Sequence, residues 1–378
     1  MKSSHIRPVA ALAAVGLLAG LVACAPSTGG DEGEETFELR YSSTYGQNTF
    51  EEITTGWVLD QIEERTNGRV TFERFYDGSL IQTADVADAL ADGRIDVATM
   101  TSNTYPTQFP IWNAAIIPLA DSNNVAHSKA QYELLSTSDV FAAEIEANNV
   151  HFIAFQSVPP IGVAGPSPIE TVEDFKAKQI RAAGLSAQLV SALGGNPVNV
   201  TVEESYDALE RGTIDAFYGA GLPYLVLSGL GDIAKFWSDN RFGAFTAKTI
   251  AFGLDTWNEL PADIQDIITE IGGVDWWDYE ITQIKDTITG VCDTLIENGG
   301  GVIIWSQEET DKANDLIGDS LWEIWRKQVA DAGVSAEDAA AFEDALRTTS
   351  VELAKSNDFD SGLEECAERS KENVAAAG

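Results

Sequence analysis

The side-chain types that usually carry catalysis are scarce in this sequence. Besides His5 near the N-terminus, the chain has two histidines, His127 and His151, and their spacing matches no catalytic motif. No G-x-S-x-G, H-E-x-x-H, G-x-G-x-x-G or P-loop pattern is present. The 60 Asp and Glu residues are too numerous for a catalytic pair to be singled out. We therefore predict that the protein is not an enzyme and that it needs no cofactor or metal.

The sequence contains a clearer candidate for ligand binding than for catalysis, an arginine at the end of a short predicted strand. Residues 179–181 form that strand, and Arg181 is its last residue. A guanidinium is always charged, and its planar fork fits a carboxylate through two parallel hydrogen bonds. At the carboxyl end of a parallel strand, Arg181 would lie where α/β proteins bind ligands. The alternative is an arginine in a surface ion pair with one of the many acidic residues.

Two copies of the pattern A-L-x-x-G-x-I-D indicate how such a site would be positioned. They occupy residues 89–96 and 208–215. In each copy a helix end is followed by a Gly suited to the left-handed C′ position, and then by a short apolar strand. Two matching corners predict two similar α/β lobes, and two lobes with a cleft between them make a ligand clamp. The alternative is that such corners recur by chance in an α/β protein.

The predicted elements around both corners alternate between strands and helices, as in mostly parallel sheets flanked by helices. We expect a long helix with Pro261 at its first position, running toward Glu297 with a kink at Gly272-Gly273. The predicted strands are residues 37–42, 69–76, 95–100, 152–155, 179–181, 197–200, 214–217, 250–254 and 302–305. The shorter predicted helices are 48–66, 84–91, 185–193 and 202–211.

The N-terminus has the features of an export signal. Lys2 and Arg7 precede an apolar stretch at residues 9–23, which is too short to span a bilayer core of about 30 Å. The stretch ends in Leu21-Val22-Ala23-Cys24, which resembles a bacterial lipobox. That resemblance implies that Cys24 becomes the lipidated first residue and anchors the protein outside the cell membrane. An ordinary secretory signal with an incidental cysteine is the alternative.

The chain beyond the leader is longer than one hydrophobic core usually supports, which also favours two lobes. We predict a signal peptide at residues 1–23 and a flexible tether at 24–36. Lobe 1 comprises residues 37–158 with about 247–285, and lobe 2 comprises 159–246 with about 286–378. The acidic helical tail from residue 307 is expected on the outside of lobe 2, packed through Leu316, Leu321, Trp322 and Trp325.

Charge and cysteine content narrow the class of partner. The formal net charge is −37, which argues against nucleic acid and anionic lipid as partners. In an exported protein, the two cysteines other than Cys24 are expected to pair, which predicts a Cys292–Cys366 disulfide. Two separate buried cysteines are the alternative. The absence of C-x-x-C gives no support for a redox motif or a cysteine-rich zinc site.

Several stretches, in order along residues 37–300, resemble the extracytoplasmic solute-binding proteins of tripartite ATP-independent periplasmic (TRAP) transporters, the DctP-like family. Each stretch is weak by itself, and together they are fairly specific. They are residues 64–70, 76–80, 92–96, 172–176, 179–181, 193–198, 205–209, 212–215 and 259–265.

The resemblance implies a two-lobed clamp of the periplasmic-binding-protein kind (type II-like), with a long helix across both lobes. It also implies an organic-acid ligand and the small and large membrane subunits of a TRAP transporter as partners. Arg181 matches the family's arginine that holds the ligand carboxylate through two hydrogen bonds.

The sequence departs from the family at two places. Where many members carry an Asn after the second Ile-Asp strand, this chain has Phe217-Tyr218-Gly219-Ala220. Where many dicarboxylate or sialic-acid binders carry a further arginine, residues 156–165 contain no Arg or Lys. One clear cation favours a monocarboxylate or a zwitterion over a dicarboxylate. Gln156 is a further candidate contact, and possible aromatic walls are Tyr45, Phe155, Tyr218 and Tyr224, each with ordinary packing as its alternative.

Two other functional interpretations remain open from the sequence. A lipoprotein substrate-binding protein of an ATP-driven importer would share the two-lobed architecture. A sensor or adhesin that never passes its ligand on is the other. The stretches at residues 64–80 and 179–181 favour the TRAP class.

Overall fold

The computed structural model describes residues 35–119, 123–201, 204–243, 247–356 and 359–377. The predicted signal peptide, Cys24 and most of the predicted tether lie outside the described residues. The described residues from Thr36 onward form one compact unit, and that unit contains two β-sheets. Among the described residues, no helix has both the length and the apolar character needed to cross a membrane.

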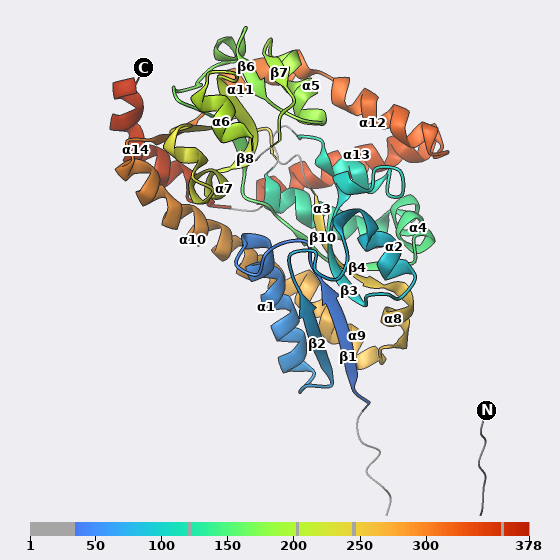
Figure 1. Ribbon diagram of the computed structural model, residues 1–378. Helices are drawn as coiled ribbons and strands as arrows, with labels where there is room; N and C mark the ends of the chain where they lie inside the picture. Colours follow the sequence, from blue (N-terminus) through green and yellow to red (C-terminus); the bar gives the residue numbers. More distant parts are fainter. Residues whose placement is uncertain (1–34, 120–122, 202–203, 244–246, 357–358, 378) are drawn as a thin grey trace, which may run out of the picture. The chain divides into compact units, whose positions relative to one another are not determined.

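The first sheet has five strands in the order β2-β1-β3-β10-β4 (Figure 1). β1 pairs in parallel with β2 and β3, whereas β10 is antiparallel to both β3 and β4. The strands are β1 (Phe37–Ser42), β2 (Val70–Phe75), β3 (Val97–Thr101), β4 (Val150–Gln156) and β10 (Lys248–Gly253). The helices that accompany them are α1 (Phe50–Arg65), α2 (Val86–Ala91), α3 (Asn124–Thr137), α4 (Asp139–Ala147) and α8 (Leu254–Glu259).

The second sheet has six strands in the order β11-β9-β5-β8-β6-β7. Only β5 runs against its neighbours β8 and β9, and the other pairs are parallel. The strands are β5 (Ile161–Gly165), β6 (Gln179–Arg181), β7 (Asn196–Val198), β8 (Ala216–Gly221), β9 (Phe236–Asp239) and β11 (Gly301–Ile304). The accompanying helices are α5 (Leu185–Ala192), α6 (Ser205–Glu210) and α7 (Leu222–Leu227). This two-lobed architecture confirms the predicted fold class, whereas β5 and β9 are strands that the sequence did not predict.

The two predicted corners have the same conformation. Gly93 and Gly212 are both left-handed, with φ of 71° and 67°. The Asp96 carboxylate accepts a hydrogen bond from the backbone N–H of Arg40 in the adjacent strand at 2.7 Å, and the Asp215 carboxylate accepts one from Gln179 at the same distance. The repeat is therefore structural, because its final Asp fastens each new strand to the neighbouring one.

A continuous helical run connects the two sheets. It comprises α9 (Ala262–Glu270), a π-helical turn at Ile271–Asp275 and α10 (Trp276–Glu297), and it begins one residue after Pro261, which is the N-cap and not the first helical residue. The π turn contains Gly272, where a Cβ would lie 1.9 Å from the carbonyl oxygen of Ile153 in β4. The glycine thus lets the helix backbone touch the first sheet, and in Figure 1 α10 continues from there toward α7 and the second sheet.

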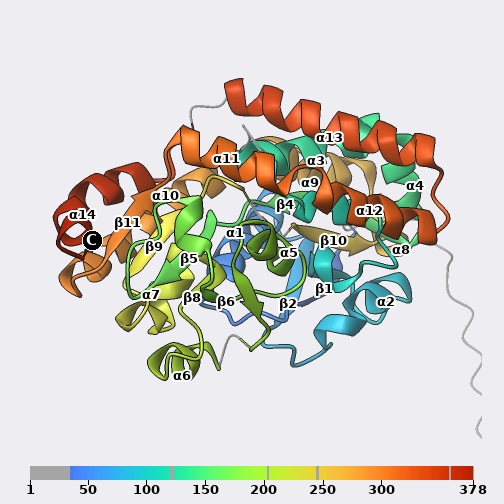
Figure 2. The same ribbon diagram turned by 90° about the horizontal axis from the view of Figure 1, so that it is seen from above.

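The prediction that the tail packs on the outside of lobe 2 is correct only in part, because its helices also contact elements of the first sheet. α11 (Gln307–Ile317) contacts α5, and α12 (Ser320–Asp331) contacts both α5 and the short helix Trp112–Ile116, which lies between β3 and β4 in the sequence. α13 (Ala336–Ser356) lies beside α3 (Figure 2). The Trp325 indole N–H donates to the carbonyl of Pro110 at 2.8 Å, and its ring packs on Phe342, which in turn packs on Phe141 of α4. Leu316 is 55% exposed and takes little part.

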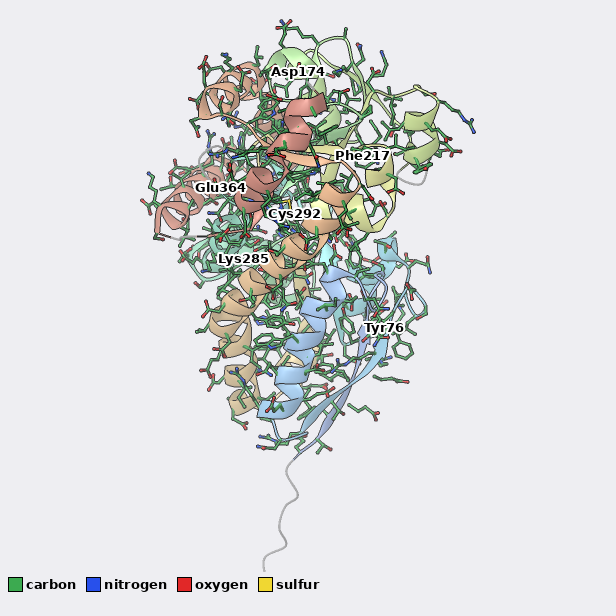
Figure 3. The ribbon with its side chains drawn as sticks, turned by 90° about the vertical axis from the view of Figure 1, so that its left-hand side faces the viewer. Tyr76, Asp174, Phe217, Lys285, Cys292 and Glu364 are labelled. Atoms are coloured by element: carbon green, nitrogen blue, oxygen red, sulfur yellow. A yellow bond between two sulfur atoms is a disulfide. The ribbon has the colours of Figure 1, made fainter. Side chains whose placement is uncertain are left out.

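The end of the tail returns to the second sheet. α14 (Leu363–Ala377) packs on β11 and α10, and Cys366 of α14 forms the predicted disulfide with Cys292 of α10 (Figure 3). Nearby, the Lys285 ammonium lies 2.6 Å from the Asp360 carboxylate. The disulfide fixes the C-terminal helix to the part of the long helix that serves the second sheet.

Two glycines of the long helix make a matched stability test. We expect Gly272→Ala to destabilise the protein by about 2 kcal/mol or more, because the new methyl group overpacks against the Ile153 carbonyl. The control Gly290→Ala should stabilise by about 0.5–1 kcal/mol, since nothing lies within 4 Å of its Cβ position. Urea unfolding measures both, and equal effects of the two variants would contradict the close contact.

Candidate functional site

Two short connections join the sheets and decide which edges face one another. Residues 157–160 lead from the end of β4 to the start of β5, and residues 240–247 lead from the end of β9 to the start of β10. Because β10 is antiparallel to β3 and β4, its start lies where those strands end, and β5 has the same relation to β8 and β9. The connections therefore set the carboxyl edges of the two sheets opposite each other, which is where α/β proteins bind ligands.

Arg181 is the last residue of β6, at the carboxyl edge of the second sheet as predicted. Its Nε donates to the carbonyl of Val200 at 3.1 Å, and its guanidinium lies 4.8 Å from the ring centroid of Phe217. The side chain is partly buried. The hydrogen bond and the ring together fix the plane of the guanidinium, so the fork is oriented before any ligand arrives.

The departure from the family at residues 217–220 concerns the immediate surroundings of this arginine. A Cβ at Gly219 would lie 3.8 Å from Nη1 of Arg181, and Gly219 has φ of 106°. A side chain in place of Gly219 would therefore contact the guanidinium. Because glycine has no side chain, residue 219 does not cover this side of the Arg181 guanidinium.

The opposite edge, on the first sheet, carries a cation that the sequence interpretation missed. Lys248, the first residue of β10, is buried, and its Nζ lies 2.5 Å from Oε1 of Glu51 and 4.4 Å from the ring centroid of Tyr45. Tyr45 in turn shares a 3.1 Å hydrogen bond between its hydroxyl and that of Thr101. The sequence signal for this site was a lysine just before a predicted apolar strand. Its partner Glu51 lies 197 positions away, so the pair could not be recognised from the sequence.

Gln156 holds this edge together from the end of β4. It pairs in register with Lys248 and is 2% exposed. Its amide nitrogen donates to the carbonyl of Glu51 and to the hydroxyls of Thr54 and Thr55 at 3.0–3.1 Å. Gln156 therefore positions the first turn of α1, which carries Glu51. Its predicted contact with ligand remains a prediction.

A buried carboxyl group lies beneath the same edge. Glu52 is 4% exposed and accepts hydrogen bonds from the hydroxyls of Tyr41 at 2.9 Å and Ser43 at 2.5 Å. Burial raises the pKa of Glu52 to about 7, because the charged form loses hydration that the two hydroxyls only partly replace. The edge thus contains a carboxyl group that is largely protonated below neutral pH.

The remaining predicted residues lie in different surroundings. Phe155 and Tyr218 are both 0% exposed, with Phe155 packed on Phe141 and Phe152 and Tyr218 packed on Phe175. Side chains alternate along a strand, so Phe155 points away from the face that Gln156 occupies. These contacts are of the kind that the packing alternative describes, and the predicted contacts of Phe155 and Tyr218 with ligand remain predictions. Tyr224 is 47% exposed on α7.

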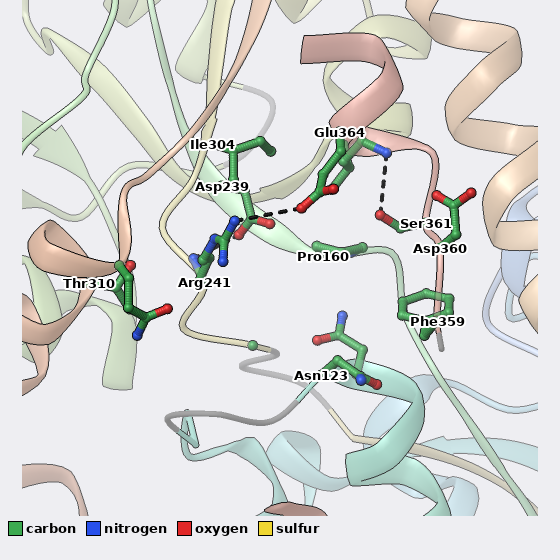
Figure 4. A pocket seen from close by; sticks show the side chains of 14 residues that line it. Asn123, Pro160, Asp239, Arg241, Ile304, Thr310, Phe359, Asp360, Ser361 and Glu364 are labelled. Atoms are coloured by element: carbon green, nitrogen blue, oxygen red, sulfur yellow. Dashed lines mark hydrogen bonds and ion pairs between the residues drawn. The ribbon is translucent and has the colours of Figure 1, made fainter. Parts of the chain in front are cut away.

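A cavity of about 460 Å³ lies at the ends of β9 and β11, next to Pro160 of the first connection (Figure 4). Arg241 lies 3.6 Å from Glu364 there, and Asp239 and Asp360 also belong to the lining. Among the described lining residues, carboxylates outnumber cations, which disfavours an organic anion. We therefore place the candidate site at the facing edges that carry Arg181 and Lys248. In the described part of the chain, no group of three or more His, Cys, Asp or Glu side chains could hold a metal ion.

Comparison with known proteins identifies a family that matches this chain. The model of bacterial extracellular solute-binding protein family 7 (DctP) matches residues 41–328. The chain belongs to this family. A monocarboxylate 2-oxoacid-binding periplasmic protein of Nostoc sp. is 27% identical over 282 residues, which is 72% of this chain and 75% of that protein.

Solved structures of similar fold are TRAP periplasmic solute-binding proteins, in agreement with the sequence resemblance. One from Desulfovibrio salexigens, an open complex with the C-terminus of a symmetry mate in its ligand-binding site, has a TM-score of 0.74 at 19% identity and covers 86% of this chain and 97% of its own. One from Rhodoferax ferrireducens, in complex with copurified benzoate, has a TM-score of 0.69 at 17% identity and covers 84% and 99%. These structures show that this chain shares their two-lobed fold.

The protonation of Glu52 predicts a specific pH dependence of stability. Its folded-state pKa of about 7 lies above the value of 4.5 in the unfolded chain, so its contribution is complete below pH 4.5 and is lost as the pH rises through 7. Glu52→Gln stays neutral, so the free energy of unfolding of the variant should rise relative to wild type by about 2–3 kcal/mol between pH 5 and pH 8.

Urea unfolding at several pH values measures this difference. Glu64→Gln, at an exposed position of the same helix, controls for the loss of one negative charge. A difference between Glu52→Gln and wild type that stays constant or falls with pH would contradict a neutral Glu52.

Proposed function

We propose that this solute-binding protein captures a small organic acid between its two lobes, holds one carboxylate on Arg181 and delivers the acid to a TRAP-type membrane transporter. The position of Arg181 at the carboxyl edge of the second sheet, opposite the carboxyl edge of the first, carries the proposal. Val200 and Phe217 orient the guanidinium of Arg181. A planar guanidinium can bind a carboxylate through two parallel hydrogen bonds.

Capture requires the lobes to move, and the connections between the sheets are where the chain would bend. The first connection is attached to the long helix, because the backbone N–H of Ser157 donates to the buried carboxyl of Glu280 in α10 at 2.6 Å. Burial raises the pKa of Glu280 well above its ordinary value. Closure about residues 157–160 would therefore be coupled to bending of the long helix at its π turn.

The ligand class is the part of the proposal that the relatives support most. The Nostoc relative is named for monocarboxylate 2-oxoacids, and the Rhodoferax structure holds benzoate. Both kinds of ligand present one carboxylate, the group that Arg181 would hold. The members of the family are solute-binding proteins and not enzymes, which is consistent with the scarcity of catalytic motifs.

Delivery would take place at the outer surface of the cell membrane. We propose that Cys24 is lipidated and that residues 24–36 tether the folded unit to the membrane, as the lipobox resemblance implies. The small and large membrane subunits of a TRAP transporter would receive the ligand from the closed form. Mass spectrometry of the membrane-extracted protein tests the anchor, and an unmodified Cys24 would refute it.

Ligand binding and the role of Arg181 can be tested together. We expect a thermal-shift screen of residues 37–378 against monocarboxylates, 2-oxoacids, sugar acids and zwitterions to give stabilising ligands, because a ligand at a hundred times its Kd adds about 2.7 kcal/mol. For a ligand so found, Arg181→Ala should lose about 2–5 kcal/mol of binding free energy in titration calorimetry.

The control is Arg211→Ala, which removes an arginine from a surface ion pair with Asp207 in the same lobe. It should bind as wild type does. Equal affinity of the Arg181→Ala variant would leave a solute-binding protein but would refute Arg181 as the carboxylate anchor.

A further inference from the structure

The facing edges carry two cations in different surroundings. Arg181 stands at the end of β6, whereas the Lys248 ammonium is enclosed by Glu51 and the ring of Tyr45. Only 7% of the Lys248 side chain is exposed, compared with 21% of the Glu51 side chain. A ligand that approaches this edge therefore meets the carboxylate more readily than the ammonium.

Glu51 is well placed to remain charged. Burial alone would raise the pKa of Glu51, but the charge and hydrogen bond of Lys248 outweigh burial, and the net shift is downward. Glu51 also occupies the first turn of α1, where the helix dipole favours a negative charge. For Lys248, burial opposes the charged form, and Glu51 and Tyr45 reverse that effect, so the net shift of its pKa is upward.

The consequence is an edge with a lysine but without net positive charge. The Lys248 charge is cancelled by Glu51, and the groups that adjoin the pair, the hydroxyls of Tyr45 and Thr101, are neutral hydrogen-bonding groups. A second carboxylate on the ligand would be set beside Glu51, whose negative charge already compensates Lys248. Like charges placed together at a binding surface are strongly unfavourable and serve to exclude wrong partners.

We propose that Glu51 is a specificity-determining residue that neutralises Lys248 and so restricts the site to solutes with one carboxylate and no second anionic group. This inference rests on the proposed function, since it assumes that Arg181 holds the first carboxylate. In this proposal the edge of the first sheet acts chiefly by excluding dianions. The Glu51–Lys248 pair shapes the site and repels a second carboxylate. The hydroxyls of Tyr45 and Thr101 bind the uncharged end of the solute.

The test compares matched acids that differ by one carboxylate. Suitable pairs are butyrate and succinate, galacturonate and galactarate, and benzoate and terephthalate. Titration calorimetry at pH 6 and low salt gives the Kd of each acid for the wild-type protein and for Glu51→Gln. For every pair in which at least one acid has a measurable Kd, wild type should bind the monocarboxylate at least tenfold more tightly than the dicarboxylate. Glu51→Gln should reduce that ratio at least tenfold, mainly by tightening the dicarboxylate.

Two further variants make the outcome specific. The double variant E51Q with K248M removes both charges, and it should keep its affinity for the monocarboxylate within a few-fold while losing the gain for the dicarboxylate. Glu173→Gln makes the same change of net charge at an exposed ion pair with Lys176, and it should leave the ratio unchanged.

The possible failures are distinguishable. If Glu51→Gln binds the monocarboxylate but its ratio matches that of wild type, the role of Glu51 is refuted and the carboxylate-binding function stands. A wild-type protein that prefers the dicarboxylate also refutes it. If wild type binds none of these acids or those of the broader screen, the proposed function itself fails, and the inference fails with it.

Discussion

The direction of one strand in each sheet is the constraint on which the arrangement of this protein depends. Strands β10 and β5 each enter their sheet from the other sheet and run against their neighbours. An antiparallel strand begins where its neighbours end, so each connection starts and finishes at a carboxyl edge. Two such connections force the carboxyl edges of both sheets to face one another, and they bring Arg181 and Lys248 to opposite sides although β6 and β10 belong to different sheets.

The long helix and the tail restrict how those edges can move. The π turn at Gly272 rests on the backbone of β4, and Glu280 accepts a hydrogen bond from the connection that follows β4. Farther along, the disulfide of Cys292 ties the same helix to α14 and the second sheet. Because α12 and α13 return to the first sheet through Trp325, the tail links the two sheets and adds a further restraint on their relative motion.

The polar groups at the facing edges are organised so that buried charge is compensated. Glu51 and Lys248 form an ion pair whose charges cancel, while burial raises the pKa values of Glu52 and Glu280. An isolated charge at such depth would be costly, and each group avoids that cost by pairing or by binding a proton. In a protein with a formal charge of −37, the one ionised carboxylate of this group is thereby compensated by the adjacent Lys248.

The sequence by itself determined the features that depend on local chemistry. The two A-L-x-x-G-x-I-D corners, the strand that ends in Arg181 and the long helix through Gly272-Gly273 follow from glycine conformation, strand length and helix periodicity, which act over a few residues. The pairing of Cys292 with Cys366 followed from the cysteine count and the predicted export. The family stretches carried the two-lobed architecture.

Only the tertiary structure decided which surfaces meet. Strands β5 and β9 are short, and β5 lies in a Gly-rich and Pro-rich stretch, so their strand character comes from the neighbours that they pair with. The tail has apolar faces that would suit either lobe, and the indole of Trp325 found its acceptor at Pro110. Phe155 and Gln156 are adjacent in sequence but lie on opposite faces of β4. The partnership of Lys248 with Glu51 joins residues 197 positions apart, and no local pattern records such a pair, because its energy exists only after the chain has folded.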